Sequence, residues 1–298
     1  MKILITGITG FIGSVLSKAL IKEGHDVLGV IYLPQEKEIL EKSQIRYFLD
    51  NNNSRDLMDF FNREAFDGVI HLAACYYLEH TPEQIENLVT SNVLFSTRIL
   101  DAAVRGGVKW FINTGTFWQN LNNKEYSPVN LYAATKEAFK SIAKYYIDNS
   151  EIDFVTLKLF DTYGPTDTRS KVFNIWKRIY QSGESFDMSA GDQFMDIVHV
   201  DDVAAAYIKT AELLSKDVSG GLSGEEFVVS TGSPKKLKEI AKIFSEVCGK
   251  KLNINWGAKP YRKNEVMKPP ELGKRVSGWK PRVSLKEGIA ELLADLKD

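Results

Sequence analysis

A tyrosine and a lysine four residues apart are the side chains in this sequence best suited to acid–base chemistry. Tyr132 and Lys136 lie in the string Tyr-Ala-Ala-Thr-Lys, within a segment of helical spacing, so both are expected on one helix face, one turn apart. A free tyrosine has a pKa near ~10, too high for proton transfer at neutral pH. Because a neighbouring ammonium stabilises the phenolate and lowers that pKa, the pair predicts a tunable general acid or base.

A hydroxyl precedes this pair in the chain, at the end of a predicted strand. The strand Val108–Asn113 delivers Thr114 to its carboxyl end, and ligands of open α/β sheets bind outside that end of the strands. Thr114 could therefore bind the same substrate oxygen as Tyr132. A hydroxyl that only caps a helix or lies in a loop is the alternative.

Three glycines follow the first predicted strand and open a helix. The string Thr-Gly-Ile-Thr-Gly-Phe-Ile-Gly, from Thr6 to Gly13, has the context of a dinucleotide site, where glycines let the backbone approach a pyrophosphate at the positive end of a helix. Its glycines stand at positions 1, 4 and 7 of the turn, not at the 1, 3 and 6 of the commoner fingerprint. A tight strand–helix turn without a ligand is the alternative.

The end of the second predicted strand bears on the choice of nicotinamide cofactor. Many dinucleotide sites place an acid there to hold the adenosine ribose, and such an acid repels the extra phosphate of NADP. Ile31–Pro34 contains no acid, which favours NADP over NAD, although no arginine replaces the acid and Lys37 is the nearest cation. Asp50, after the strand-like Arg46–Leu49, is expected to accept a hydrogen bond from the adenine amino group or to be a simple turn residue.

The elements that must position these side chains alternate between strand and helix over the first two-thirds of the chain. Strands are predicted at Lys2–Thr6, Asp26–Tyr32, Gly68–Leu72, Val108–Asn113 and Phe154–Leu159. Helices are predicted at Ser14–Glu23, Asp56–Phe61, Asn92–Arg105 and Leu131–Asp148. This alternation predicts an α/β fold, a Rossmann doubly wound parallel sheet.

After Gly164-Pro165 the alternation weakens. The remaining predicted elements are helices at Val172–Gln181, Asp202–Leu214, Leu237–Cys248 and Leu285–Leu296, a strand at Ile197–Val200 and a loop at Lys216–Glu226. We therefore divide the chain into an NAD(P)-binding Rossmann domain, residues 1–165 with a return segment near 196–215, and a smaller α/β lobe, residues 166–298, that mainly binds substrate.

Composition narrows the class of protein. The 298 residues carry 38 Lys+Arg and 39 Asp+Glu, a net charge of −1, which argues against a nucleic-acid-binding protein. No run of about 18 apolar residues predicts a transmembrane helix, so no membrane contact is expected. The two cysteines suit a reducing compartment, and glycines interrupt the apolar start before it could form a signal peptide, so a cytoplasmic location is expected. The four histidines lack metal-ligand spacing, and no metal is expected.

Taken together, these motifs resemble those of the extended short-chain dehydrogenase/reductases, the NAD(P)-dependent epimerases and dehydratases of nucleotide sugars. The matching segments are Thr6–Gly13, Val69–Ala74, Asn92-Val93, Thr114, Tyr132–Lys136, Phe160–Pro165, His199–Ala204, Ser277–Pro281 and Ser284–Gly288. The resemblance covers almost the full chain.

The resemblance implies roles for individual residues. Tyr132 would be the general acid or base, Lys136 would bind the nicotinamide ribose and lower the tyrosine pKa, and Thr114 would hydrogen-bond the sugar oxygen. Together with Tyr132, Lys136 and Asp50, the implied cofactor-binding residues are Gly7, Gly10, Phe11, Ile12, Gly13, Leu72, Ala73, Ala74, Asn92 and Phe160. The expected substrate-binding residues are Thr116, Trp118, Asp161, Thr162 and Arg169, with Lys171 and Arg275 as further candidates for the diphosphate. His71 is expected to be structural.

Departures from the family pattern narrow the activity. Gly115 and Thr116 stand where the 4,6-dehydratases carry an Asp-Glu pair, so dehydration is not expected. Trp118-Gln119 replaces a common Tyr-Gly, which indicates either a reshaped sugar pocket or plain packing. Asp161 replaces an asparagine that contacts the nucleotide phosphates, so it is expected to hold the loop or a sugar hydroxyl instead.

The strings Thr114–Gln119 and Phe160–Pro165 are similar to those of the CDP-abequose synthase-like deoxysugar 4-ketoreductases. The expected function is NADPH-dependent reduction of the carbon-4 ketone of a CDP- or dTDP-linked deoxysugar, for a surface polysaccharide such as lipopolysaccharide. An NAD-dependent nucleotide-sugar 4-epimerase is the main alternative, and a non-catalytic NADP-binding sensor is a further one. Relatives pair the helices corresponding to Asn92–Arg105 and Leu131–Asp148 into an intersubunit four-helix bundle, so a homodimer is expected.

Overall fold

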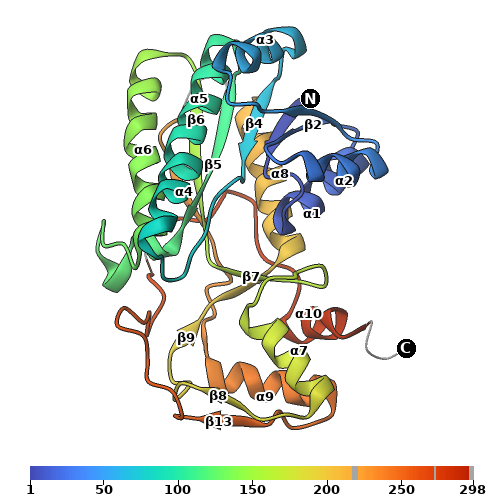
Figure 1. Cartoon of the computed structure of the whole chain (residues 1–298), viewed down its shortest axis with the longest axis vertical. Coiled ribbons are helices and arrows are strands. Elements are labelled where there is room, and N and C mark those ends of the chain that lie inside the picture. Colours follow the sequence, from blue (N-terminus) through green and yellow to red (C-terminus); the bar gives the residue numbers. More distant parts are fainter. Residues whose placement is uncertain (217–220, 272, 295–298) are drawn as a thin grey trace.

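The computed structural model describes residues 1–216, 221–271 and 273–294, and within them the main feature is a seven-stranded parallel sheet (Figure 1). The strands follow the order β11-β6-β5-β4-β1-β2-β3. They are β1 (Lys2–Thr6), β2 (Asp26–Ile31), β3 (Arg46–Leu49), β4 (Gly68–His71), β5 (Trp110–Thr116), β6 (Asp153–Leu159) and β11 (Glu226–Val229). Because β1 lies between β2 and β4, the strand order reverses at β1, and ligands of such sheets bind at the carboxyl ends near that point.

Helices cover both faces of this sheet. They are α1 (Phe11–Lys22), α2 (Lys37–Lys42), α3 (Ser54–Glu64), α4 (Ile85–Val89), α5 (Ser96–Arg105), α6 (Leu131–Asn149) and α8 (Val200–Lys216). Ile3 and Ile5 of β1 belong to the core under α1 and α8, and Leu4 belongs to the core under α3, α5 and α6. Burial on both faces explains why the strands appear in the sequence as continuous apolar runs.

Short helical turns connect several of these elements. They are η1 (Pro34–Glu36), η2 (Pro82–Gln84), the π-helical turn η3 (Thr90–Phe95), η4 (Phe117–Gln119) and η5 (Leu121–Asn123). The π-helical turn lies between α4 and α5, so the predicted helix Asn92–Arg105 is in fact two elements. Such turns are frequent at functional sites.

A smaller lobe lies at the carboxyl ends of the strands, below the sheet in Figure 1. Its elements are β7 (Asp161–Tyr163), α7 (Val172–Ser182), β8 (Phe186–Met188), β9 (Phe194–Met195), β10 (Ile197–His199), β12 (Lys235–Lys236), α9 (Leu237–Cys248), β13 (Ile254–Trp256) and α10 (Leu285–Leu292). The strands form three two-stranded pairs, β10 with β7, β12 with β9 and β13 with β8. Trp176 of α7 and Phe244 of α9 are fully buried in the core of the lobe.

The structure corrects the sequence interpretation at several boundaries. Residues 226–229, which follow a predicted loop, form the edge strand β11, because a short run of one aromatic and two valines suffices beside the buried β6. The last predicted helix ends earlier, at Leu292, and residues 295–298 and 217–220 lie outside the described residues. The strand β5 runs to Thr116, so Thr114 lies inside the strand instead of following it.

In the described part of the chain, no helix is both long and apolar enough to cross a bilayer.

Candidate active site

The glycine turn after β1 packs directly against the segment that follows β4. Gly7 has a φ of +67°, and a Cβ there would lie 2.8 Å from the backbone nitrogen of Ala73. A Cβ on Gly13 would lie 2.2 Å from the carbonyl oxygen of Gly7. Gly10 is the N-cap of α1 and offers no side chain, so the N–H groups of the first helical turn are left to an anion. The residues present therefore fit a dinucleotide pyrophosphate.

A cavity of about 290 Å³ lies above this turn, at the carboxyl ends of β1, β4 and β5. Most of the residues that the sequence assigned to the cofactor and the substrate line it. They are Gly7, Gly10, Phe11, Ile12, Gly13, Leu72, Ala74, Thr114, Thr116, Trp118, Tyr132, Lys136, Phe160, Asp161, Thr162 and Arg169. Residues from distant parts of the chain thus meet at one place.

Asn92 and Ala73 do not line this cavity, but they contact the segments that form it. The buried amide of Asn92 accepts a hydrogen bond from the backbone nitrogen of Cys75 and donates to its carbonyl, at 2.7 and 2.8 Å, and donates to the Thr135 hydroxyl at 3.0 Å. Asn92 therefore ties the loop after β4 to α6, the helix that carries Tyr132. Ala73 contributes the backbone that packs under the glycine turn.

Asp50 has a protein partner that the sequence did not indicate. Its buried carboxylate accepts two hydrogen bonds from the guanidinium of Arg98, at 2.9 and 3.0 Å, and a third from the backbone nitrogen of Asn52. The side chain of Asp50 has no exposed surface. The adenine contact expected of Asp50 stays a prediction, and the contact that the structure shows joins the end of β3 to α5.

Tyr132 and Lys136 lie on one face at the start of α6, and burial alters both of their pKa values. Burial raises the pKa of Tyr132, Tyr76 raises it further and Arg169 lowers it. The sequence predicted that Lys136 would lower this pKa. In the structure burial makes the largest contribution to the shift, and Arg169 is the cation that opposes it. Burial also lowers the pKa of Lys136 to about 8. Tyr132 therefore holds its proton at neutral pH, the state needed for a proton donor.

The hydroxyl of Thr114 is already engaged by the protein. Its Oγ1 donates to the carbonyl of His71 at 2.7 Å and lies 2.6 Å from the hydroxyl of Tyr207, a fully buried residue of α8. A carbonyl only accepts, so the single Thr114 proton goes to His71 and Tyr207 donates to Thr114. Thr116 differs, because its Oγ1 accepts from the backbone nitrogen of Trp118 at 3.3 Å and that contact leaves its proton unused.

His71 is held from both sides of its ring. Its Nδ1 lies 2.8 Å from the Thr6 hydroxyl and its Nε2 lies 2.8 Å from the Ser96 hydroxyl. The ring is fully buried, and burial, followed by Lys136, lowers its pKa well below the usual range. These contacts agree with the structural role predicted for His71.

A second cavity of about 520 Å³ extends from the first into the smaller lobe. The two cavities share Tyr76, Phe117, Trp118, Asp161, Thr162, Arg169 and Lys171. Their continuity gives a path from the glycine turn, past Tyr132, to the lobe, which is the arrangement required for a cofactor and a nucleotide-linked substrate to meet.

Three cations line this second cavity. Arg169 makes a bidentate ion pair with Asp167 and lies 4.7 Å from the centre of the Phe11 ring. Lys171 donates to the Tyr76 hydroxyl at 3.2 Å. Arg262 pairs with Glu265 at 2.8 Å. The sequence analysis missed Arg262, because only the fold brings its segment to the cavity, whereas Arg275 lines a separate cavity instead.

Aromatic rings form the wall beside Tyr132. Tyr76 meets Tyr132 edge-on, with ring centres 5.1 Å apart, and its ring lies 5.9 Å from that of Trp118. The Lys171 ammonium lies 4.5 Å from the centre of the Tyr76 ring. Trp118 thus packs against another ring and also lines the cavity. The sequence left open whether it reshapes a sugar pocket or only packs.

Gln119 fixes the loop that carries Trp118. Its Oε1 accepts from the backbone nitrogen of Thr116 at 2.8 Å, and its Nε2 donates to Glu137, the residue after Lys136, at 2.5 Å. The residue that replaces the common glycine therefore connects the end of β5 to α6.

Asp161 lines both cavities, where they join. Burial raises the pKa of its carboxyl group, and Lys171 and Arg262 oppose that shift. Cations therefore lie near this carboxylate, and the roles expected of Asp161, holding the loop or a sugar hydroxyl, stay predictions.

The structure also brings one histidine and two carboxylates together outside these cavities. His199 Nδ1 lies 3.7 Å from Asp201, and Nε2 lies 3.4 Å from Glu291 of α10. Since the carboxylates face opposite ring nitrogens, they bracket the imidazole more than they converge on one ion.

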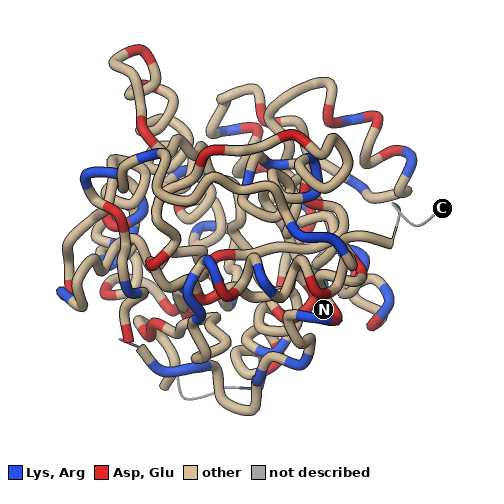
Figure 2. The backbone as a smooth tube through the Cα atoms, turned by 90° about the horizontal axis from the view of Figure 1, so that it is seen from below, with Lys and Arg blue, Asp and Glu red and all other residues tan. Residues whose placement is uncertain are grey.

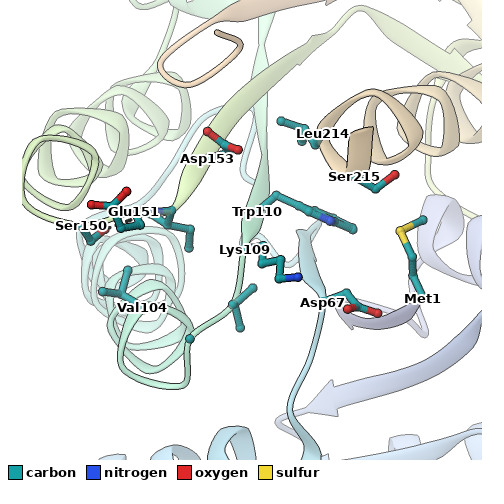
Figure 3. A pocket seen from close by; sticks show the side chains of 13 residues that line it. Met1, Asp67, Val104, Lys109, Trp110, Ser150, Glu151, Asp153, Leu214 and Ser215 are labelled. Atoms are coloured by element: carbon teal, nitrogen blue, oxygen red, sulfur yellow. Dashed lines mark hydrogen bonds between the residues drawn. The ribbon is translucent and has the colours of Figure 1, made fainter. Parts of the chain in front are cut away.

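The opposite edge of the sheet, at the amino ends of the strands, holds a further cavity of about 590 Å³ (Figure 3). Its labelled lining includes Asp67, Lys109, Trp110, Glu151 and Ser215. None of the residues that the sequence assigned to a ligand lines it.

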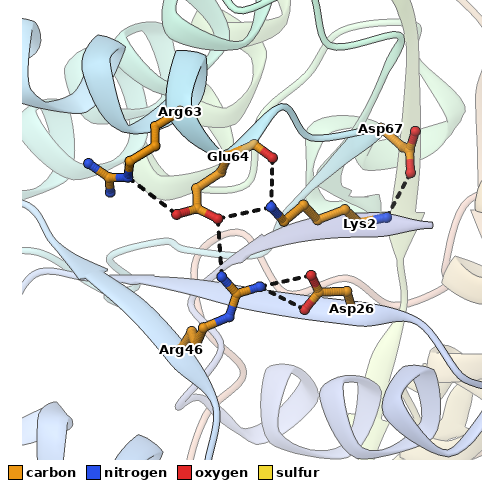
Figure 4. A network of polar contacts seen from close by, with 6 residues as sticks. All are labelled: Lys2, Asp26, Arg46, Arg63, Glu64 and Asp67. Atoms are coloured by element: carbon orange, nitrogen blue, oxygen red, sulfur yellow. Dashed lines mark hydrogen bonds and ion pairs between the residues drawn. The ribbon is translucent and has the colours of Figure 1, made fainter.

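A network of ion pairs lies beside that cavity (Figure 4). Lys2 bonds the carboxylate of Glu64 at 2.9 Å, Arg46 bonds the same group at 3.2 Å, and Arg46 also makes a bidentate pair with Asp26. The backbone nitrogen of Lys2 donates to Asp67 at 2.7 Å. These contacts join β1, β2 and β3 to α3.

Comparison with known proteins places this site in a family. The model of the NAD dependent epimerase/dehydratase family matches residues 3–229. A CDP-abequose synthase of Salmonella muenchen is 28% identical over 297 residues, 98% of this chain and 97% of that protein. A UDP-glucuronate 4-epimerase of Thermodesulfobacterium geofontis is 26% identical over 96% of this chain and 93% of its own length.

A solved structure supports the fold. MoeE5, in complex with UDP-glucuronic acid and NAD, superposes with a TM-score of 0.84 over 100% of this chain and 99% of that one, at 24% identity. At this identity the likeness speaks for the architecture, the same Rossmann sheet with a smaller lobe at its carboxyl edge.

Proposed function

Because this chain belongs to the NAD-dependent epimerase/dehydratase family, and is therefore an NAD(P)-dependent oxidoreductase acting on a nucleotide sugar, we propose that it reduces the carbon-4 ketone of a nucleotide-linked deoxysugar. The proposed substrate is CDP-linked, with a dTDP-linked sugar as the second choice. Support for the base comes from the CDP-abequose synthase, which aligns with this chain over almost its whole length.

The observation that carries this proposal is the aromatic wall around the Tyr132 phenol. Tyr76 and Trp118 face the cavity beside it, and Phe160, stacked on Phe117 with ring centres 4.8 Å apart, closes another side. A sugar that has lost hydroxyl groups presents apolar carbon to such a wall. A sugar hydroxyl turned toward these rings would be left without a hydrogen-bond partner, which costs binding free energy.

The chain's own residues divide the work of reduction. A reduced nicotinamide dinucleotide, with its pyrophosphate held at the glycine turn, would supply the hydride. Tyr132, whose pKa burial raises, keeps its proton and donates it to the carbonyl oxygen as charge develops there. The buried ammonium of Lys136, one helical turn away, stabilises the phenolate that remains.

A second hydrogen bond to the carbonyl oxygen comes from one of two threonines. The family resemblance assigns it to Thr114, but the Thr114 proton is used by His71. Thr116 lines the same cavity on the same face of β5 and has its proton free for a ligand. We therefore propose Thr116 as the donor and Thr114 as its neighbour that fixes the end of β5.

A nucleotide-sugar 4-epimerase is the second candidate function. The observation in its favour is the full-length similarity to a UDP-glucuronate 4-epimerase, and such an enzyme would use the same Tyr132, Lys136 and threonine hydroxyl. It needs a retained, recycled cofactor, whereas a reductase must exchange its cofactor at each turnover.

We also propose a homodimer through α4, α5 and α6. Ile85, Val89 and Leu94, along α4 and the π-helical turn, and Tyr145 of α6 are exposed. Burying these four side chains between two copies would remove apolar area from water. We place the reaction in the cytoplasm, upstream of a surface polysaccharide, where a reduced cofactor is available.

The test is oxidation of NADH and NADPH, followed by absorbance, with a panel of CDP- and dTDP-linked 4-keto-deoxysugars. Stoichiometric oxidation with one ketone would support the reductase and identify the base. No oxidation with any ketone, together with a nicotinamide that co-purifies and stays bound, would reject the reductase in favour of the epimerase.

A further inference from the structure

The carboxylate of Glu36 folds back onto the glycine turn. It lies in η1, the turn that follows β2, and accepts hydrogen bonds from the backbone nitrogens of Leu33 at 2.9 Å and Tyr32 at 3.2 Å. Its other oxygen accepts from the hydroxyl of Thr9. Thr9 stands between Gly7 and Gly10 of the turn. One carboxylate therefore connects the end of β2 to the dinucleotide turn after β1.

This position is the corner where the adenosine ribose of a dinucleotide lies. β1 and β2 are neighbouring parallel strands, paired from Lys2 with Asp26 to Thr6 with Val30, so their carboxyl ends are adjacent. In doubly wound sheets an acid at this corner accepts from the ribose hydroxyls. The sequence has no acid within Ile31–Pro34. The η1 turn, however, brings Glu36, two residues further along, back to the end of β2. The absence of an acid within Ile31–Pro34 therefore does not by itself favour NADP.

We propose that Glu36 makes the cofactor site selective for NAD(H) over NADP(H). The inference rests on the cofactor site of the proposed function. A carboxylate has about four acceptor positions, and the three contacts described leave one for a ribose hydroxyl. NADP replaces the 2′-hydroxyl with a phosphate that carries a charge of about −2, which removes the donor and places like charges together.

The guanidinium of Arg98 does not pair with this acid in the structure. It is held instead by the Asp50 carboxylate, just after β3, and by Asn52. Asn52 in turn donates to the Tyr32 hydroxyl at 3.0 Å, so Arg98, Asp50, Asn52 and Tyr32 form one connected network of hydrogen bonds. Lys37, the residue after Glu36, begins α2 and is the cation that could meet a phosphate.

The experiment measures binding, which needs no sugar substrate. NADH and NADPH are titrated into the full-length protein, freed of bound nucleotide, and followed by nicotinamide fluorescence. We expect NADH to bind at least about tenfold more tightly, a difference of about 1.4 kcal/mol. Glu36→Gln should reduce that ratio to about threefold or less by weakening NADH and improving NADPH. Glu38→Gln, an exposed acid two positions along that pairs with Lys42, should leave the ratio unchanged.

The outcomes separate this inference from the proposed function. Equal or tighter binding of NADPH by the unaltered protein would overturn the role of Glu36, and so would a ratio that Glu36→Gln does not change. Glu36→Ala serves as a second variant, and a thermal melt of each shows whether the turn still folds. NADH selectivity without reduction of any ketone would reject the proposed function and keep this inference. Ketone reduction with NADPH preferred would reject this inference and support the proposed function.

Discussion

The two edges of the central sheet both hold cavities, but their chemistry differs. At the amino edge, a cavity of about 590 Å³ lies beside charges that neutralise one another, Lys2 with Glu64 and Arg46 with Asp26. At the carboxyl edge, a cavity of about 290 Å³ that continues into a second one of about 520 Å³ contains a phenol and an ammonium with shifted pKa values and a threonine hydroxyl that accepts one hydrogen bond. The two edges therefore differ in the polar groups that converge on the cavity, and such convergent groups mark the site in this protein.

The direction of the chain explains the difference. In a parallel sheet every strand ends at the same edge, and the helix after β1 begins there, so its positive end faces the cavity. The amino edge receives helix C-termini and strand starts instead. Ion pairs such as Lys2–Glu64 satisfy the groups that emerge there, which leaves little for a ligand.

The largest effect is expected from removing the phenolic hydroxyl of Tyr132 at the carboxyl edge. Tyr132→Phe deletes the proton donor and keeps the ring, so we expect the rate of ketone reduction to fall about 10³-fold, within the usual range for a general acid. Lys109→Met, in the amino-edge cavity, should leave the rate within about twofold. Steady-state kinetics with cofactor fluorescence titration measures both. A Tyr132→Phe enzyme with unimpaired turnover would remove Tyr132 from the chemistry.

Lys136 should cost stability as well as supply function. Its pKa in the folded protein is about 8, below the 10.5 of the unfolded chain, so the unfolded state binds the proton more tightly. Stability therefore rises with pH between about 8 and 10.5, and the penalty is full below pH 8. Lys136→Met should raise the free energy of unfolding at pH 7 by up to about 3 kcal/mol while abolishing turnover, and the gain should shrink by pH 10.

The control for this variant lies on the same helix. Lys144→Met removes an exposed lysine that pairs with Asp148, and it should change stability by less than about 0.5 kcal/mol at either pH. Denaturant unfolding at pH 7 and pH 10 provides the data. A Lys136→Met protein less stable than the parent at pH 7 would show that the ammonium is better compensated than its burial indicates.

The two threonines of β5 separate catalysis from positioning within the carboxyl edge. Thr116→Val should lower kcat about 10²-fold with little change in KM, since it removes a donor to the developing oxyanion, and Thr116→Ser should restore most of the rate. Thr114→Val leaves the His71 carbonyl and the Tyr207 hydroxyl unpaired, so it should lower stability by about 1–3 kcal/mol and kcat less than Thr116→Val does. The opposite ranking of the two kcat values would return the donor role to Thr114.

The smallest effect is expected from the ion pairs at the amino edge. The Glu64 pKa is lowered, chiefly by the hydrogen bond from Lys2, so its contribution to stability is present at neutral pH and is lost as the pH falls through the folded pKa. Glu64→Gln should cost about 1 kcal/mol or less at pH 7 and progressively less as the pH falls through the lowered pKa of Glu64, with turnover unchanged. Thermal melts over a series of acidic pH values would show it, and a loss that does not change with pH would contradict the ion-pair account.

The sequence predicted the sheet and much of the cavity lining because both depend on local signals. The apolar runs from Lys2 and Gly68, and the glycines after the first strand, are short-range patterns that the fold preserves. The Tyr132–Lys136 spacing is likewise a property of one helix. The common edge of a parallel sheet then brings these segments together.

The features that the sequence missed depend on partners far along the chain. Tyr207 meets Thr114 from α8, and Arg262 reaches the cavity from the last part of the lobe. Glu36 had a nearer signal, since Pro34 at the start of a helical turn, with an acid two residues later, is typical of an N-terminus whose acid bonds the preceding backbone. The expected lowering of the Tyr132 pKa was wrong in sign because burial outweighs the guanidinium of Arg169, and burial is not visible in spacing.

The strand β11 lies far along the chain from β6, the strand it pairs with, and this separation has a consequence for folding during synthesis. This strand pairs with β6, from Glu226 beside Thr156 to Val229 beside Leu159, yet the ribosome makes β7 to β10 and α8 between the two. Until residue 229 has emerged, β6 is an open edge whose N–H and C=O groups can pair with another nascent chain. A fragment ending at residue 165 would keep that edge permanently and should aggregate. The sheet is therefore completed only after β7 to β10 of the lobe have been synthesised.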